Sequence, residues 1–321
     1  MTQNHPPWLD VERAKALRRI WMNVKIIGIA AFAFALLTAM PAVADPFTFS
    51  TGNVTNLMAT AARPNIGGKF EIESADDFVT TRPTSITSAT FTGLLIGGAT
   101  VGNVGEVVVE IYRVFPADSN TARTSFPVPP FSTNQVPARQ NSPSDVALDS
   151  RDTASGNLTV NTKVLSDAFT ALNSVQPGGI HPLPGVTTGG NGQITGQEVE
   201  FDVTFTTPFS LSPDHFFFVP QVQVTGGEFL WLSGTRPLVP SPFPPGVTDL
   251  QSWTRDEISP NNLAPDWLRV GTDIVGGIPA PTFNAAFSLT GTVPEPTTLS
   301  LLGVALAGVG FIEFRRRGAR S

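Results

Sequence analysis

The sequence of 321 residues contains no cysteine and only three histidines. Without cysteine the chain has no disulfide, no thiolate zinc site, no iron–sulfur cluster and no thiol nucleophile. Of the two histidines in the central part of the chain, His181 is expected in a loop and His215 at a strand end. Side chains that are adjacent on a strand point to opposite faces, so Asp214 and His215 should not form an acid–base pair. Stability must therefore come from apolar burial.

Catalytic motifs and excess positive charge are also missing. We find neither Gly-x-Ser-x-Gly nor His-Glu-x-x-His, nor a glycine loop for phosphate, and we therefore expect no enzyme and no cofactor. Residues 45–293 hold 11 of the 20 basic and 22 of the 26 acidic residues, so their net charge is near −11, against −6 for the whole chain. Such a surface repels nucleic acid, but it is compatible with divalent cations or neutral sugars.

The N-terminus reads as a secretory signal peptide. Five basic residues precede an apolar run from Ile26 to Leu37, and "TAMPAVA" follows. Ala42 and Ala44 are the small residues that signal peptidase requires before a cut that leaves Asp45 first. Translation from Met22 would give a signal of normal proportions, and an uncleaved membrane anchor is the alternative.

The C-terminus has the composition of a membrane span. The run from Leu299 to Ile312 is apolar or small except at Ser300, and it gives about 21 Å of helix, so flanking residues must extend it across the bilayer. A cationic stop follows, formed by Arg315, Arg316 and Arg317. The positive-inside tendency puts these arginines in the cytoplasm and the preceding chain outside.

Before this run stands the tripeptide Pro294, Glu295 and Pro296, which two prolines keep extended and accessible. Together with the span and the arginines, over residues 293–320, it resembles a PEP-CTERM sorting signal. In that family exosortase, a membrane-embedded cysteine transpeptidase, recognises the tripeptide and releases or transfers the ectodomain. The resemblance implies an exported protein that is anchored in the inner membrane before processing and then lies at the cell surface or outside. The alternative is an ordinary anchor with an accidental tripeptide.

We therefore divide the chain into a signal peptide (1–44), an ectodomain (45–292) and a sorting signal with a transmembrane helix (293–321). Alternation with period two dominates the ectodomain, most clearly in "QEVEFDVTFTTPF", where Val199, Phe201, Val203 and Phe205 share one face. The other predicted strands are Ser85–Leu95, Glu106–Phe115, Asn157–Val164, Asp214–Val224, Glu228–Leu232, Trp267–Ile274 and Phe283–Thr290.

Helical periodicity is nearly absent, and only Lys163–Val175 offers a weak candidate for a helix. Many strands without intervening helices predict an all-β fold, an antiparallel β-sandwich of jelly-roll type in one domain. Two proline-rich loops, Phe126–Asp145 and Thr235–Thr248, are either braced crossings or functional segments. Segments such as "DHFFFVPQV" and "DLQSWTRDE" resemble an ectodomain that recurs in exported PEP-CTERM proteins, and this resemblance brings no known chemistry.

The ectodomain offers several candidate sites. Glu198, Glu200 and Asp202 share the polar face of one strand at a spacing of about 6.5 to 7 Å, near the carboxylate separation of an inverting glycosidase, although solvent positions of an amphipathic strand explain them equally. Trp253 lies among polar residues and is the tryptophan to test for stacking on sugars. Weak calcium candidates are Asp149 with Asp152, unless they form a capped turn with Arg151 paired to a carboxylate, and Asp76 with Asp77.

These observations favour a non-catalytic surface or matrix module that is processed by exosortase. The PEP-CTERM resemblance also implies that the protein is linked to exopolysaccharide production and biofilm, and therefore that a glycan is a partner. Two alternatives stay open. The first is a carbohydrate-active enzyme that uses the Glu198 row, and the second is a structural component of a surface layer.

Overall fold

The structure is a computed structural model that describes residues 44–121, 140–180, 187–257 and 267–294, together with Lys15 and Arg18. Residues Pro46–Val293 form one compact unit. In the described part of the chain, no helix has the length and apolar character needed to cross a membrane. The signal peptide and the apolar run at 299–312 fall outside the described residues, and the domain boundaries stay predictions.

The compact unit is built almost entirely of strands, which confirms the all-β expectation. The strands are β1 (Asp45–Ser50), β2 (Ala59–Ala61), β3 (Ile72–Thr80), β4 (Thr84–Ile96), β5 (Val104–Arg113), β6 (Asp149–Asp152), β7 (Leu158–Ala171), β8 (Ser174–Val175), β9 (Ile194–Leu211), β10 (Asp214–Val224), β11 (Glu228–Gly234), β12 (Trp253–Asp256), β13 (Leu268–Arg269), β14 (Asn284–Ala285) and β15 (Phe287–Val293). Short helical turns are η1 (Val101–Asn103), η3 (Pro177–Gly179) and the π-helix η4 (Val270–Val275).

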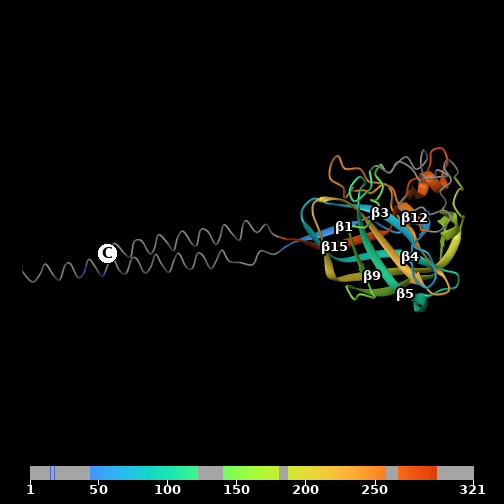
Figure 1. The fold of residues 1–321 in the computed structure, drawn as a ribbon, viewed down its shortest axis with the longest axis horizontal. Coiled ribbons are helices and arrows are strands. Elements are labelled where there is room, and N and C mark those ends of the chain that lie inside the picture. Colours follow the sequence, from blue (N-terminus) through green and yellow to red (C-terminus); the bar gives the residue numbers. More distant parts are fainter. Residues whose placement is uncertain are drawn as a thin grey trace, which may run out of the picture. The chain divides into compact units, whose positions relative to one another are not determined.

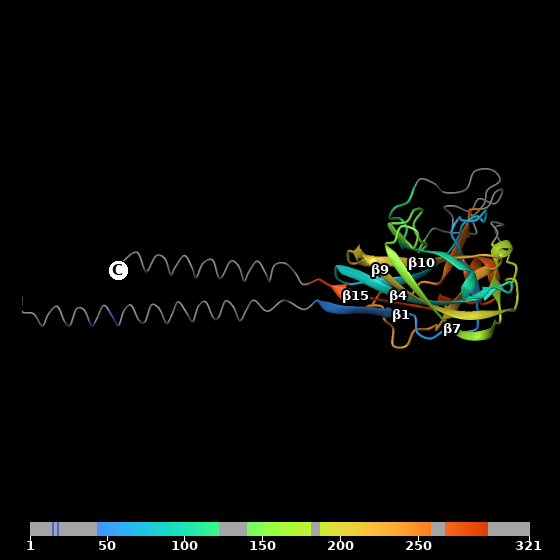
Figure 2. The same ribbon diagram turned by 90° about the horizontal axis from the view of Figure 1, so that it is seen from below.

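The strands form two sheets that lie in separate layers (Figures 1 and 2). The larger sheet has nine strands in the order β1-β15-β4-β11-β2-β8, with β14 beside β11, β9 beside β4, and β7 beside β9. The smaller sheet has six strands in the order β13-β12-β3-β10-β5-β6. The registered pairs are antiparallel except β2 with β8. The first and last strands, β1 and β15, are neighbours (Figure 1).

The main core lies between the two sheets. Strand β9 sends Val199, Phe201 and Val203 inward, and β10 sends Phe216 and Phe218 from the opposite layer. Aromatic rings fill much of this space; those of Phe91 and Phe201 stack with centroids 4.9 Å apart. The alternation seen in the sequence thus becomes one apolar and one polar face on β9, as predicted.

A second, smaller core covers the outer face of the six-stranded sheet. Tyr112, Phe217 and Val219 project from the sheet, and Leu250 and Trp267 lie over them, so that all five are buried. Strands β3 and β12 therefore have almost no exposed residue on either face. This second covering layer is what places polar side chains of the sheet in a buried environment.

Several predicted strands are confirmed. The clearest are β10, whose bounds agree, and β4, β5 and β11, which agree to within two residues. The weak helix candidate at Lys163–Val175 is wrong, because β7 continues to Ala171 with its backbone paired to β9, and β8 follows. The strand predicted at Trp267–Ile274 stops at Arg269, where Asp273 accepts hydrogen bonds from the backbone and guanidinium of Arg269 and the chain turns into η4.

The proline-rich loop Thr235–Thr248 is a braced crossing. Arg236 donates to the backbone oxygens of Asp249 and Leu250 at 3.0 and 2.7 Å, and Phe243 packs into the main core. Most of the other proline-rich loop lies outside the described residues, as does His181.

Candidate functional site

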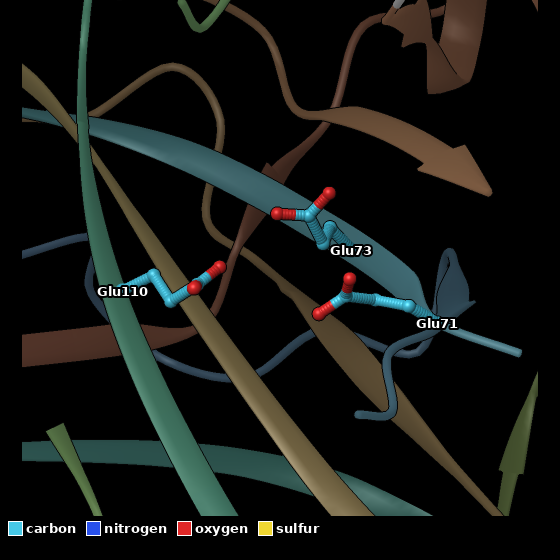
Figure 3. A group of neighbouring side chains, drawn as sticks. All are labelled: Glu71, Glu73 and Glu110. Carbon is cyan, nitrogen blue, oxygen red and sulfur yellow. The ribbon is translucent and has the colours of Figure 1, made fainter. Parts of the chain in front are cut away.

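Three glutamates meet on the outer face of the six-stranded sheet, and we call them the glutamate cluster. Glu71 immediately precedes β3, Glu73 lies in β3, and Glu110 lies in β5. Their carboxylate oxygens point toward one another and lie within 4.8 Å (Figure 3). Strand β10 runs between β3 and β5, so residues that are 37 or more positions apart in the sequence converge only through sheet pairing.

One cation and one hydroxyl hold the centre of the cluster. Arg255, from β12, donates to Oε2 of Glu73, and the hydroxyl of Tyr112 donates to Oε1. The guanidinium of Arg255 also lies 4.4 Å from the ring centroid of Trp267 and donates to the backbone oxygen of Asp145 at 3.1 Å. Glu73 and Arg255 are 1% and 6% exposed, so this is a buried ion pair.

The three carboxyl groups differ in proton affinity. Burial raises the pKa of Glu71 to about 7, with help from the charges of Glu73 and Glu257. Burial and the charge of Glu73 raise the pKa of Glu110 to about 8. Burial acts in the same direction on Glu73, but the charge and hydrogen bonds of Arg255 outweigh it and lower its pKa. At neutral pH the cluster therefore combines the Glu73 carboxylate with a Glu110 carboxyl that mostly keeps its proton, while Glu71 is near the midpoint of its titration.

Gln221 adds an unsatisfied acceptor beside the cluster. This side chain on β10 is fully buried, and its Nε2 donates to Oε2 of Glu110 at 3.2 Å. Its Oε1 has no hydrogen-bond partner among the described residues. A buried polar atom without a hydrogen-bond partner lowers the free energy of unfolding by about 1–3 kcal/mol. Gln221 therefore destabilises the fold unless another group contacts its oxygen.

A partial signal for the glutamate cluster is present in the sequence, although period-two alternation does not predict the site. Glu71 and Glu73 are two residues apart, as are Glu110 and Tyr112, which is the spacing of side chains on one strand face. In a strand that alternates between apolar and polar residues, such charged positions are expected to face solvent. Nothing in the sequence indicates that loops cover the outer face of the six-stranded sheet. The convergence of β3 and β5 on β10 is visible only in the structure.

The predicted carboxylate row lies elsewhere, on the outer face of the nine-stranded sheet. Glu198, Glu200 and Asp202 sit on β9 between β4 and β7, and Nζ of Lys163 is 3.6 Å from Oε1 of Glu200. Glu198 is nearly buried, and burial, followed by the charge of Glu200, raises its pKa. The row thus occupies the middle of a sheet face, where Thr90 and Thr92 oppose Asp202 and Glu200.

Trp253 needs correction as a sugar-stacking candidate. It lies in β12 and is only 2% exposed, packed in the second core with Trp267 and Leu250. Its polar sequence neighbours are themselves buried, since β12 pairs with both β3 and β13 beneath covering loops. The ring is therefore closed to an external sugar.

At the first weak calcium candidate the alternative holds in part, because Arg151 pairs with a neighbouring carboxylate as expected. Asp149 and Asp152 lie in strand β6 rather than in a turn; Asp149 accepts from the guanidinium of Arg151, and Asp152 accepts from the backbone of Ser155. Asp76 and Asp77 point to opposite faces of β3. Asp76 accepts from the backbone of Ala285, whereas Oδ2 of Asp77 lies 2.6 Å from Nε2 of His215.

The His215 contact is unexpected from sequence. His215 does not engage Asp214 as an acid–base pair, in keeping with the prediction, but it pairs across the sheet with buried Asp77. The pKa of Asp77 is raised to about 6 because its burial outweighs the hydrogen bond and charge of His215.

The compact unit ends directly at the predicted sorting signal. Strand β15 reaches Val293, and Pro294 is exposed. Ala44 is half-buried just before β1. The remaining sorting and cleavage residues lie outside the described part of the chain: Glu295, Pro296, Arg315, Arg316, Arg317 and Ala42.

Comparison with known proteins assigns this tail. A family model described as the PEP-CTERM protein-sorting motif matches residues 292–317. The chain therefore carries a PEP-CTERM sorting domain, which confirms the resemblance drawn from the tripeptide, span and arginines. No curated protein and no solved structure matches the chain. The motif implies an exported protein that is processed by exosortase and is anchored at the membrane before processing.

Proposed function

We propose that the β unit is a non-catalytic module of the cell surface or extracellular matrix that binds exopolysaccharide through one face of its larger sheet. The strand order supports a β-sandwich of jelly-roll type. Across one layer the strands lie side by side in the order β1, β15, β4 and β9, and across the other in the order β3, β10, β5 and β6, which is the arrangement of two interleaved Greek keys.

The observation that carries the proposal is an ordered polar face on four adjacent strands. We call it the polar sheet face, and it consists of Ser88, Thr90 and Thr92 on β4, Thr159, Asn161 and Lys163 on β7, Glu200, Asp202 and Thr204 on β9, and Ser288 and Thr290 on β15. Registered pairs place Ser288, Thr90, Asp202 and Asn161 in one row across the strands. The hydroxyls of Thr90 and Ser288 are 2.6 Å apart.

Such a face suits a sugar chain better than a folded partner. Hydroxyl, amide and carboxylate groups match the donors and acceptors of saccharides, while most of its residues are half-buried or exposed and none is aromatic. The net charge near −11 between residues 45 and 293 favours a neutral polysaccharide, because a polyanion would be repelled.

The test is binding of the full chain to exopolysaccharide isolated from its host, measured by co-sedimentation. We expect binding by the native chain and a loss of at least tenfold in Asn161→Leu/Asp202→Leu, which removes two members of one row while keeping strand-compatible residues. Glu106→Leu, on the other sheet, is the matched control and should bind normally. Equal binding by all three chains, or by none, would refute the proposed face.

A carbohydrate-active enzyme is the second candidate, and its only support is the spacing of Glu198, Glu200 and Asp202. Release of reducing ends from the same polysaccharide, abolished by Glu198→Gln or Asp202→Asn, would establish it. A structural surface-layer role is favoured by β7, an edge strand of 14 residues on which Val164 and Leu165 are exposed. Bulges at Val164 and Ser166 interrupt that edge and oppose pairing between copies. Concentration-dependent sedimentation distinguishes this role.

A further inference from the structure

We propose that the glutamate cluster and Gln221 bind a calcium ion. This site is independent of the polar sheet face, because it lies on the outer face of the other sheet. It also involves none of the acidic residues that the sequence had suggested as calcium ligands.

The spread of the oxygens fits calcium. Ca²⁺ takes oxygen ligands at about 2.3–2.6 Å, so two ligands on opposite sides of the ion stand about 4.6–5.2 Å apart. One oxygen from each of the three glutamates already lies within 4.8 Å of the others (Figure 3). Mg²⁺, with bonds of about 2.0–2.1 Å and near-ideal octahedral demands, would need the carboxylates to draw closer together.

Gln221 supplies the observation that a mere group of acids would lack. Its amide is fully buried beside Glu110, and its Oε1 has no hydrogen-bond partner among the described residues. Amide oxygens are ordinary Ca²⁺ ligands. The amide now faces Glu110 with Nε2. A half-turn about its Cγ–Cδ bond would exchange the two amide atoms, so that Oε1 would contact a calcium ion between the glutamates and Gln221 and would no longer be unsatisfied.

The local charge also fits a divalent ion. A bound cation would displace the protons of Glu71 and Glu110; with all three glutamates then ionised and Arg255 positive, the cluster would carry a net charge of −2, and Glu257 adds further negative potential near Glu71. Arg255 is held on the Oε2 side of Glu73 by Trp267 and the backbone of Asp145, which leaves Glu71 and Glu110 without a cationic partner in the described contacts. Three carboxylates and one arginine sum to a charge of −2, which a divalent cation would neutralise.

Partial exposure gives the ion a route to the site. Glu71 and Glu110 are half-buried rather than buried, while Glu73 and Gln221 form the closed side. Water can complete the coordination on the open side, as it does in many calcium sites. An affinity in the range of extracellular calcium modules, about 10⁻⁴–10⁻³ M, is expected because Arg255 stands close by.

The experiment is titration of the full chain, purified in detergent, with CaCl₂ and separately with MgCl₂. Binding is followed by calorimetry and by the melting temperature, with EGTA as the ion-free reference. We expect one Ca²⁺ per chain, at least tenfold preference over Mg²⁺, and a higher melting temperature with calcium. Glu110→Gln and Gln221→Met should each lose at least tenfold in affinity, whereas Glu106→Gln, on the same strand as Glu110, should bind as the native chain does.

The variants also separate lost binding from lost folding. Glu110→Gln should melt at least as high as the native chain in EGTA, because it removes a buried carboxyl, and yet gain nothing from calcium. Absence of calcium binding by the native chain would overturn the proposal. So would binding that is unchanged in both Glu110→Gln and Gln221→Met, since the ion would then lie elsewhere.

Discussion

Replacing Arg255 by methionine removes the cation that pairs with Glu73 in the glutamate cluster. Methionine keeps much of the apolar stem that packs on Trp267, so the change isolates the guanidinium. Glu73 would lose its ion-pair partner while remaining 1% exposed, and the carbonyl of Asp145 and the hydroxyl of Tyr112 would lose a donor. Breaking a buried pair by removing one partner costs about 3–5 kcal/mol. We therefore expect the free energy of unfolding to fall by that amount.

The assay is urea unfolding of the full chain in EGTA, followed by tryptophan fluorescence, since Trp231, Trp253 and Trp267 are all buried. Glu73→Gln in the Arg255→Met background should recover most of the loss, because a neutral amide has no charge to compensate. A double-mutant cycle should give a coupling energy above about 2 kcal/mol. Arg255→Lys keeps the charge without the planar fork and should lie between the native chain and Arg255→Met.

The pH dependence checks the same reasoning. Without Arg255, burial dominates and the pKa of Glu73 rises, so the folded variant prefers the protonated carboxyl. The deficit of Arg255→Met relative to the native chain should then be smaller at pH 5 than at pH 8. A loss below about 1 kcal/mol at pH 8, or a deficit that does not change with pH, would refute the view that Arg255 stabilises a buried carboxylate.

Three further outcomes are expected. In EGTA, native stability should decline by on the order of 6 kcal/mol from pH 5 to pH 9, because the folded pKa values of Glu71 and Glu110 exceed the ordinary value of 4.5 and the stabilising protons are lost as pH rises through about 7 and about 8; a flat urea midpoint would contradict this. Phe201→Ala should cost about 3–5 kcal/mol in urea, since the ring is fully buried and stacked on Phe91; a cost below about 1 kcal/mol would contradict the packing. Glu200→Gln should change stability by less than about 1 kcal/mol, because its pair with Lys163 is exposed; a larger loss would indicate a structural role.

Period-two reading succeeded where a strand has one wet face. Strand β9 alternates between buried Val199, Phe201 and Val203 and the more exposed polar residues between them. In this strand a single sheet face meets the core, so burial follows the side-chain direction and the sequence reports it directly. Strand β11 is buried on both faces, and it was predicted because it is apolar along most of its length.

The same reading failed where both faces of a strand are covered and charged residues lie among the buried ones; β10, which is covered on both faces but mainly apolar, was predicted. Strand β3, with the sequence "IESADDFVT", was not predicted as a strand, because Glu73, Asp76 and Asp77 suggest solvent, yet all three are buried. Strand β12, "WTRD", was missed for the same reason. Loops that cover the outer face create this second interior, and their position depends on long-range contacts such as that of Trp267 with the backbone of Ser144. No local pattern encodes such contacts.

The sorting tail was the easiest part to predict because its signal is linear. The family model matches one continuous stretch, residues 292–317, in which the tripeptide, the apolar run and the arginine group follow one another in the sequence. The glutamate cluster is the opposite case, since Glu71 and Glu110 are 39 positions apart and meet only through β10. A linear sorting signal can therefore be predicted from sequence more readily than a buried polar site that forms only on folding.

The boundary between the two parts follows from strand pairing. The last residue of β15 that pairs with β4 is Thr292, opposite Ser85, the strand ends at Val293, and Pro294 cannot donate a backbone hydrogen bond to extend the ladder. Because β15 lies between β1 and β4 and sends Phe287 and Leu289 into the main core, a cut that reached into it would expose two neighbours and open the core. A cut at or after Pro294 leaves every pair of β15 in place. The proline that opens the sorting motif thus also ends the sheet, which allows the tail to be removed without disturbing the β unit.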